Sequence, residues 1–215
     1  MNSVSAYVEP FFGAGALFAS VKSTYNQIPT IINDINPELV SLLNTIKHDF
    51  EAFCIELQEL EAAYLSIRSH EVRNYRFYQR REQYWKEQIG SVRASALLLF
   101  LMSTGFNGIW QVNKKTGRYG TGAGLLNHKG SLFDYSLLND WHRALQATSI
   151  QCGSYADLDV PAGAFVYCDP PYRDSYADYG HAFTDEDHKA LIKWCRQLQE
   201  RGCVVWLANR EANDS

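Results

Sequence analysis

Residues 7–21 read Tyr-Val-Glu-Pro-Phe-Phe-Gly-Ala-Gly-Ala-Leu-Phe-Ala-Ser-Val: an apolar start, a turn with two glycines, and a run of small or apolar residues. This pattern predicts a short strand, a glycine turn and the beginning of a helix. Glycines at such a turn let the backbone come close to a ligand. The stretch therefore predicts an α/β unit with a ligand beside Gly13 and Gly15, although an ordinary strand-to-helix turn would have the same pattern.

Strands and helices continue to alternate on either side of the middle of the chain. Further strands are expected at residues 30–34, 149–152, 165–168 and 203–207. Helices are expected after Pro37, over residues 134–147, and from Thr184, as the capping residue, to about Arg201. Such alternation is typical of a parallel, doubly wound sheet, so the fold class is α/β with a Rossmann-like sheet.

The middle of the chain interrupts this alternation. We expect helices over residues 49–66 and 71–104, and then a long loop over residues 105–131 that is rich in Gly, Asn, Lys and Thr. Loops of this length often bind a ligand. The expected domains are a core, residues 1–55 and 136–215, and an inserted helical lobe, residues 56–135.

The composition is that of a globular protein, with 46% hydrophobic and 13% aromatic residues. No apolar run is long enough to span a membrane. The five cysteines show no Cys-x-x-Cys spacing and the six histidines show no metal-ligand spacing, so we expect no metal. Scattered thiols of this kind are typical of a cytoplasmic protein.

Positive charge is concentrated in one segment. Residues 68–118 contain ten Lys and Arg but three acidic residues, a net charge of +7 in a chain whose total is −4. The rest of the chain therefore carries −11. A basic middle segment indicates a surface for a polyanion, although a solvated charged helix would show the same excess.

Asp34 is a candidate cofactor ligand at the end of the second expected strand. It follows Gly15 by 19 residues, an offset typical of acids that bind the ribose of an adenosine-containing cofactor. The glycine turn lacks the full Gly-x-Gly-x-x-Gly pattern, which favours S-adenosylmethionine over NAD. Alternatively, Asp34 caps the helix that begins at Pro37.

The sequence Asp169-Pro170-Pro171-Tyr172 follows the apolar residues 163–168. Two prolines make a stiff turn, because each fixes φ and lacks a donor. The turn would hold a carboxylate, a carbonyl oxygen and an aromatic ring together at the end of a strand. Such a group of residues suits a planar ring that carries an exocyclic amino group.

Together these segments resemble the Dam-type (D12 class) DNA adenine-N6 methyltransferases over nearly the whole chain. The similar segments are the cofactor loop at 7–15, the ribose-binding strand end at 33–37, the target-recognition segment at 104–113, the catalytic segments at 154–157 and 166–172, and a later strand end at 207–209. The resemblance implies a class I methyltransferase sheet with an inserted target-recognition lobe. It also implies methylation of the adenine N6 amino group in double-stranded DNA, with S-adenosylmethionine as cofactor and with base flipping.

The resemblance also implies roles for individual residues. The catalytic residues would be Asp169, Pro170 and Tyr172. The cofactor would contact Glu9, Pro10, Phe11, Gly13, Gly15, Asp34, Ile35, Asp157 and Asp169. DNA would contact Phe106, Asn107, Gln111, Asn113, Lys114, Lys115 and Arg118, with the last three at phosphates. Phe106 would wedge into the space left by the flipped base, unless it is a core residue at a helix end.

Two departures from the family pattern change what is expected. Gln111 stands where the family usually has Arg, and Gln suits adenine whereas Arg suits guanine, so a GATC target is not expected. The chain lacks the family's usual first segment and stops at Ser215, so we expect a truncated enzyme that binds its cofactor weakly or not at all.

Two alternatives remain, an N4-cytosine DNA methyltransferase and an inactive DNA-binding remnant. In each case we expect a monomer in the cytoplasm of a bacterial or phage-infected cell.

Overall fold

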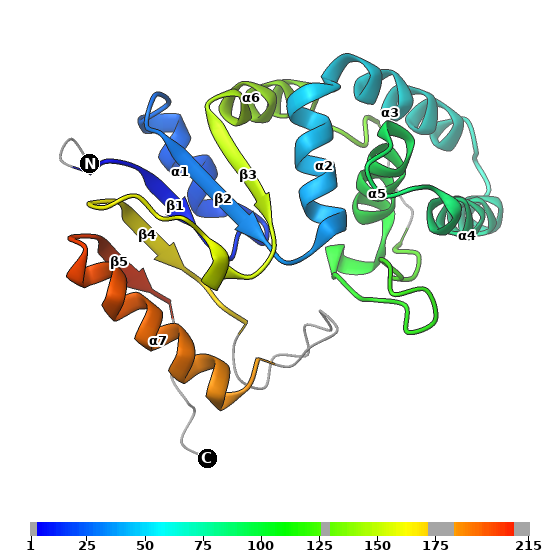
Figure 1. Ribbon diagram of the computed structural model, residues 1–215. Helices are drawn as coiled ribbons and strands as arrows, with labels where there is room; N and C mark the ends of the chain where they lie inside the picture. Colours follow the sequence, from blue (N-terminus) through cyan, green and yellow to red (C-terminus); the bar gives the residue numbers. More distant parts are fainter. Residues whose placement is uncertain (1–3, 126–129, 172–182, 209–215) are drawn as a thin grey trace. The chain divides into compact units, whose positions relative to one another are not determined.

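A computed structural model describes residues 4–125, 130–171 and 183–208 (Figure 1). The chain forms two compact units. Among the described residues, unit 1 contains residues 4–40, 144–171 and 183–208, and unit 2 contains residues 41–125 and 130–143.

The unit boundaries differ from the expected lobe of residues 56–135. Position 56 lies inside the unbroken helix α3 (Phe50–Leu65). The preceding helix α2 (Pro37–His48) is divided between the units after Val40. Residues 41–48 of this helix belong to unit 2, where the hydroxyl oxygens of Thr45 and Ser95 lie 2.8 Å apart in a buried hydrogen bond.

Unit 1 contains a parallel sheet of five strands, which confirms the predicted α/β class. The strands are β1 (Tyr7–Glu9), β2 (Thr30–Asp34), β3 (Thr148–Cys152), β4 (Phe165–Cys168) and β5 (Val204–Leu207). Their order is β3-β2-β1-β4-β5, and every pair is parallel. The chain builds outward from β1 to β3 and then returns to place β4 on the other side of β1. The strand order therefore reverses between β1 and β4, where open α/β sheets bind ligands outside the carboxyl ends of their strands.

Alternating residues of the strands face opposite sides of the sheet. Val8 and Val166 are fully buried in one apolar cluster with Leu191 and Leu198 of α7 (Asp185–Glu200). Their neighbours Tyr7 and Phe165 face the other way, and their rings stack with centroids 6.0 Å apart. Helix α1 (Ala16–Thr24) lies on the side of the sheet opposite α7 (Figure 1). Thr184 caps α7, as predicted, in a reciprocal capping box with Asp187.

Unit 2 is helical among the residues described. It contains residues 41–48 of α2, then α3, α4 (His70–Lys86), α5 (Val92–Thr104) and most of α6 (Tyr135–Gln146). Helix α5 is the central element, because most of its residues are buried, among them Leu97 and Leu101.

The prediction of one helix over residues 71–104 was wrong, because the chain leaves the helical conformation between α4 and α5. Gly90 has φ 101°, a value that favours glycine. The Ser91 hydroxyl then accepts a 3.0 Å hydrogen bond from the Ala94 nitrogen and caps a new helix.

The expected long loop has more structure than predicted. A short 3-10 turn, η1 (Phe106–Gly108), follows α5. Residues 111–120 then form a hairpin, which we call the 111–120 hairpin. Its two sides are joined by hydrogen bonds from the Asn113 nitrogen to the Arg118 oxygen at 2.8 Å and from the Gly120 nitrogen to the Gln111 oxygen at 2.7 Å.

Candidate active site and DNA-binding hairpin

The buried side chain of Asn33 joins the ends of three strands in unit 1. Its Nδ2 donates to the carbonyl oxygen of Pro10, after β1, at 2.9 Å, and to that of Gly153, after β3, at 3.0 Å. Only 3% of Asn33 is exposed, so these bonds satisfy a polar group that would be costly to bury unpaired. No individual role was predicted for Asn33, although an amide inside an apolar strand just before Asp34 was a usable signal.

Asp34 binds the glycine turn directly. Its Oδ2 accepts a hydrogen bond from the Gly13 nitrogen and its Oδ1 accepts one from the Asn36 nitrogen, each at 2.9 Å. Gly13 and Gly15 have φ values of 51° and 66°, so the turn needs glycine at both positions. Burial raises the pKa of the Asp34 carboxyl, and the hydrogen bond from Gly13 opposes that rise.

Asp34 does not cap helix α2, which was the alternative role considered for it. Asn36 caps α2 instead, because its Oδ1 accepts hydrogen bonds from the nitrogens of Glu38 at 3.0 Å and Leu39 at 3.4 Å. The Asp34 carboxylate is therefore directed to the glycine turn rather than to the helix.

Glu9 is a buried acid at the end of β1, with 2% of its surface exposed. It accepts hydrogen bonds from the Tyr7 hydroxyl and from the backbone of Phe18 in α1. Burial raises the pKa of Glu9 to about 7, against the lowering effect of these hydrogen bonds, and the negative charge of Asp169 raises it slightly more. Glu9 and Asp169 are therefore close enough to interact, as expected from the pairing of β1 with β4.

Asp169 and Pro170 follow β4 at the same edge of the sheet. Asp169 is exposed, whereas Pro170 is buried. The nitrogen of Ala208 donates to the oxygen of Cys168 at 2.8 Å, so the pairing of β4 and β5 extends to the residue before Asp169. A carboxylate on this supported strand end is accessible to a ligand. Tyr172 lies outside the described residues.

The other predicted cofactor residues also lie at strand ends in unit 1. Phe11 packs against Tyr155, with ring centroids 5.1 Å apart, and Tyr155 begins the short 3-10 turn η2 (Tyr155–Asp157). Asp157 at the end of η2 is exposed, as is Ile35, with 66% of its surface accessible. The turn after β1, the end of β2 and the turn after β3 therefore bring the predicted cofactor residues to one edge of the sheet.

In unit 2, Phe106 is not a core residue. Half of its surface (51%) is exposed, which removes the alternative of a buried residue at the helix end. The two residues after it, Asn107 and Gly108, both have left-handed backbone conformations, with φ values of 52° and 62°. Asn107 is unusual among the described residues, since non-glycine residues seldom adopt positive φ.

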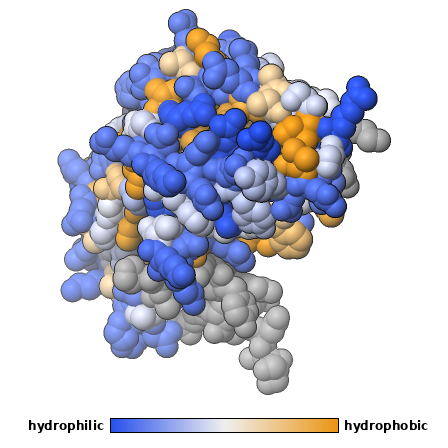
Figure 2. Space-filling model, turned by 90° about the vertical axis from the view of Figure 1, so that its right-hand side faces the viewer, coloured by the Kyte–Doolittle hydropathy of each residue, from blue (hydrophilic) through white to orange (hydrophobic). Residues whose placement is uncertain are grey.

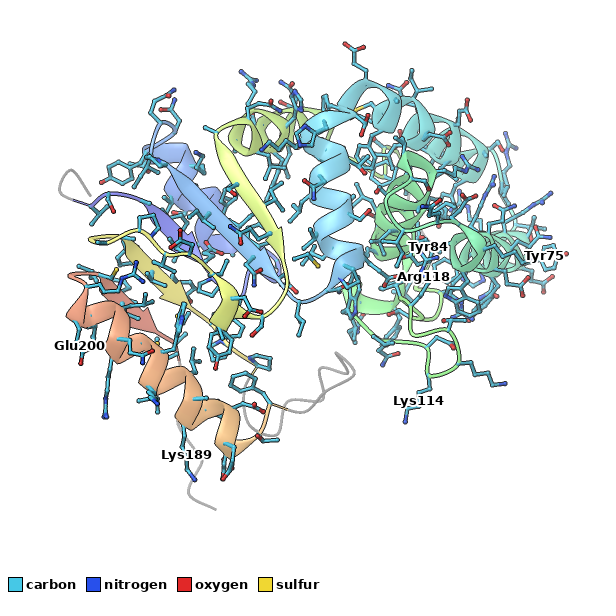
Figure 3. The ribbon with its side chains drawn as sticks, viewed as in Figure 1. Tyr75, Tyr84, Lys114, Arg118, Lys189 and Glu200 are labelled. Atoms are coloured by element: carbon cyan, nitrogen blue, oxygen red, sulfur yellow. The ribbon has the colours of Figure 1, made fainter. Side chains whose placement is uncertain are left out.

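The 111–120 hairpin exposes the two predicted lysines at its tip. The Asn113 Oδ1 accepts hydrogen bonds from the nitrogens of Lys115 at 2.9 Å and Thr116 at 3.1 Å, and so shapes the turn. Lys114 and Lys115 are exposed, and Lys114 points away from the turn (Figure 3). Gln111 is also exposed, on one side of the hairpin.

Arg118 has a different position from the one expected for a phosphate contact. Its Nη1 donates to the carbonyl oxygens of Tyr84 at 2.8 Å and Glu87 at 2.6 Å, at the carboxyl end of α4. Its guanidinium also lies 4.1 Å from the centre of the Tyr84 ring (Figure 3). The guanidinium thus anchors the hairpin to α4, because the last carbonyls of a helix attract cations.

Two more side chains of α4 hold the hairpin, and neither role was predicted from the sequence. Arg81 Nη1 donates to the oxygens of Gly120 at 2.9 Å and Thr121 at 3.1 Å, and Trp85 Nε1 donates to the oxygen of Tyr119 at 2.8 Å. A Cβ at Gly120 would lie 2.7 Å from the Cβ of Asn113. This close approach explains a glycine in the segment that departs from the family pattern.

Within residues 4–125, 130–171 and 183–208, no three His, Cys, Asp or Glu side chains are grouped so as to hold a metal ion. None of the helices in these ranges is both long and apolar enough to cross a membrane.

The sequence profile of the D12 class N6 adenine-specific DNA methyltransferases matches residues 1–215. The chain belongs to this family. It is 32% identical to the type II methyltransferase M.MjaIII of Methanocaldococcus jannaschii, over 97% of this chain and 74% of that protein. It is 31% identical to the DNA adenine methylase of Escherichia coli K12, over 95% and 71%. It is 28% identical to the type II methyltransferase M1.LlaDCHI of Lactococcus lactis, over 94% and 71%.

Membership of the D12 class confirms the resemblance inferred from the sequence motifs. The chain is an adenine-specific DNA methyltransferase by family, which requires a methyl donor and a DNA substrate. Neither the N4-cytosine enzyme nor the inactive remnant is favoured by these similarities.

Proposed function

We propose that this D12-class chain transfers the methyl group of S-adenosylmethionine to N6 of an adenine rotated out of duplex DNA. The amino group of that adenine is bound by the Asp169 carboxylate and the Pro170 carbonyl oxygen. One observation carries the proposal: β1 and β4 are paired where the strand order reverses, and Glu9 and Asp169 interact at their carboxyl ends. This is the part of an α/β sheet where ligands bind.

The residues at the sheet edge fit an adenosine-containing cofactor. The Asp34 carboxylate accepts hydrogen bonds from the backbone nitrogens of Gly13, Asn36 and Ile35, and a carboxylate can accept about four in all, so it has capacity for a ribose hydroxyl. No atom lies within 4 Å of where a Cβ of Gly13 would be, so the turn is open to a ligand there. Exposed Ile35 offers an apolar surface to the adenine ring of the cofactor. S-adenosylmethionine, when bound, supplies a methyl group on a sulfonium.

The chain's own contribution to the chemistry is to bind and polarise the amino group. An adenine amino nitrogen is a poor nucleophile, because its lone pair is delocalised into the ring. Two acceptors, the Asp169 carboxylate and the Pro170 carbonyl oxygen, would hold its two hydrogens and localise that pair. They would also stabilise the positive charge that grows on nitrogen, more in the transition state than in the ground state. The resemblance adds Tyr172 as a stacking surface for the base.

Unit 2 would bind the DNA. Exposed Phe106 could fill the space left by the flipped base, which costs a few kcal/mol to extrude. Gln111 and Asn107 could contact base edges, and Gln pairs best with adenine. Lys114 and Lys115 at the hairpin tip would bind phosphates, while Asn113 maintains the turn that presents them.

Methyl transfer from tritiated S-adenosylmethionine to unmethylated genomic DNA tests the proposal. The unchanged chain should produce N6-methyladenine, and Asp169→Asn should lower kcat by at least about 100-fold, as loss of a charge-stabilising group typically does. Asp159→Asn is the matched control, since Asp159 is an exposed acid of unit 1 that is not among the predicted site residues. Equal transfer by Asp169→Asn and the unchanged chain would overturn the role of Asp169, and N4-methylcytosine as the product would overturn the substrate.

A further inference from the structure

Three arginines and one acid of unit 2 lie close to one another. Arg76 and Arg80 belong to α4 and Arg93 belongs to the first turn of α5. Arg93 forms an ion pair with Glu56 of α3. The charges of both Arg93 and Arg76 act on Arg80, which Glu56 also reaches. We call these three arginines the arginine cluster.

Two guanidiniums of the arginine cluster are bound to neutral groups. Arg76 Nη1 donates to Gln79 Oε1 at 2.8 Å, and Arg80 Nη1 donates to Gln83 Oε1 at 2.9 Å. Among the described residues, the carboxylate joined to the cluster is that of Glu56, which is paired with Arg93. The cluster therefore carries a surplus of about two positive charges, since guanidinium stays protonated at any physiological pH.

The three positive charges repel one another, which is unfavourable in the free protein. Burial lowers the pKa of the Arg80 guanidinium below its ordinary value, and the positive charges of Arg93 and Arg76 lower it further. Like charges in proximity favour an anion, and planar guanidiniums suit the oxygens of a phosphate.

The surroundings of the cluster are those of a polar binding surface. Gln79 Nε2 donates to the hydroxyl of Tyr75 at 2.9 Å, which extends the row of polar groups along α4. Tyr75 is 62% exposed and projects from the end of the unit (Figure 3). The side of the molecule that contains α4 is largely hydrophilic (Figure 2). These features match an extended polyanion better than an apolar partner.

We infer that Arg76, Arg80 and Arg93 form a phosphate-binding site for the backbone of duplex DNA, in addition to the lysines of the 111–120 hairpin. The inference rests on the proposed function, which supplies DNA as the ligand. It adds a second DNA-binding surface, on α4 and α5. Phosphate contacts position a protein on DNA without reading its sequence. The arginine cluster should therefore contribute to affinity and to its salt dependence but not to the choice of methylated sites.

The salt dependence of DNA binding measures the number of phosphates that the protein neutralises. The test compares the full chain with Arg76→Gln/Arg80→Gln by fluorescence anisotropy on an unmethylated duplex, over a series of salt concentrations. Two lost phosphate contacts reduce the slope of log affinity against log salt by about 1.8. The affinity ratio between the chain and the variant then shrinks about tenfold between about 50 and 200 mM salt. Arg93 is left intact, because its ion pair with Glu56 joins α3 to α5.

The control variant Lys193→Gln/Arg196→Gln removes the same charge from exposed positions on α7 and should keep the slope of the unchanged chain. Glu56→Gln should steepen the slope, because it releases Arg93, provided that thermal unfolding shows the variant to be folded. Three results would each overturn the inference: an unchanged slope in Arg76→Gln/Arg80→Gln, an equal loss in the α7 control, or no DNA binding by the unchanged chain. DNA binding with the expected slopes but without methyl transfer would leave the arginine cluster supported and the proposed function refuted.

Discussion

The carboxylate of Asp34 accepts a 2.9 Å hydrogen bond from the backbone nitrogen of Gly13, 21 residues earlier in the chain. One bond thus fixes the glycine turn after β1 against the end of β2. The second carboxylate oxygen is bound to Asn36, so the group is held at both ends. A cofactor that enters this edge of the sheet meets a turn whose conformation is already set, which reduces the entropy lost on binding.

Asp34→Ala should weaken the binding of S-adenosylmethionine at least about tenfold, because it removes both the acceptor for Gly13 and the proposed ribose ligand. Loss of one hydrogen bond to a charged group is worth about 1.5–3 kcal/mol, which corresponds to that factor or more. Isothermal titration calorimetry measures the effect. Asp34→Asn keeps one side-chain oxygen, so its affinity for S-adenosylmethionine should lie between those of the unchanged chain and Asp34→Ala. Asp159→Ala should bind the cofactor as the unchanged chain does. Equal affinity in all four proteins would contradict the role of Asp34.

Phe106→Ala should leave stability nearly unchanged but lower methyl transfer. Since half of the Phe106 side chain is already exposed, truncation leaves no cavity in the core and should cost at most about 0.5 kcal/mol of unfolding free energy. Loss of a wedge should reduce the fraction of extruded base, which 2-aminopurine fluorescence in a duplex detects. Ile55→Ala, at a 58% exposed position of α3, is the control. A large loss of stability in Phe106→Ala would show that the residue serves packing instead.

Arg118→Ala should destabilise unit 2, whereas Lys114→Ala should not. The Arg118 variant leaves the carbonyl oxygens of Tyr84 and Glu87 without this donor and loses the contact with the Tyr84 ring, for a cost of about 3 kcal/mol. The Lys114 variant loses one exposed charge and should reduce the slope of log DNA affinity against log salt by about 0.9. Thermal unfolding and anisotropy distinguish the two. The structural role of Arg118 would be wrong if Arg118→Ala unfolded at the same temperature as the unchanged chain and only reduced the slope of log DNA affinity against log salt.

The sheet could be predicted from the sequence because each strand is marked locally. β1 and β4 are apolar runs that end at an acid followed by proline, and Asp34 ends β2 before the turn to Pro37. The parallel pairing then brings the candidate cofactor residues to one edge without further information. The parallel sheet confirms the predicted fold, and the profile match confirms the predicted family. The roles of individual site residues remain predictions.

The hairpin and the helix break could not be predicted in the same way. The 111–120 hairpin is held by Arg81 and Trp85, which precede their partners Gly120 and Tyr119 by more than thirty residues. No local sequence pattern predicts such contacts. The break before α5 depends on Gly90 and Ser91, but a Gly-Ser pair inside a helical pattern is a weak signal on its own. Arg118 was expected to bind phosphates because of its positive charge alone. The sequence does not show that its guanidinium binds the carbonyl oxygens of Tyr84 and Glu87.

Glu9 should make the stability of unit 1 depend on pH. Its pKa is about 7 in the folded protein, against an ordinary value of 4.5, mainly because it is buried. Between those pH values the folded state holds a proton that the unfolded state has lost. Stability is therefore fully present below about pH 4.5 and falls as pH rises through about 7, by at most about 3 kcal/mol. The buried carboxylate becomes increasingly costly over this range.

Glu9→Gln isolates this effect, because the amide keeps the shape of the side chain and cannot ionise. Urea unfolding between about pH 4 and 8 should show the variant gaining stability relative to the unchanged chain as pH rises. Tyr7→Phe is the complementary test: the Tyr7 hydroxyl donates to Glu9 and lowers the pKa of Glu9, so its removal should extend the fall in stability to higher pH. Parallel curves for Glu9→Gln and the unchanged chain would mean that folding does not raise the pKa of Glu9. The interaction between Glu9 and Asp169 would then lose its support, because two neighbouring carboxylates favour protonation of one of them.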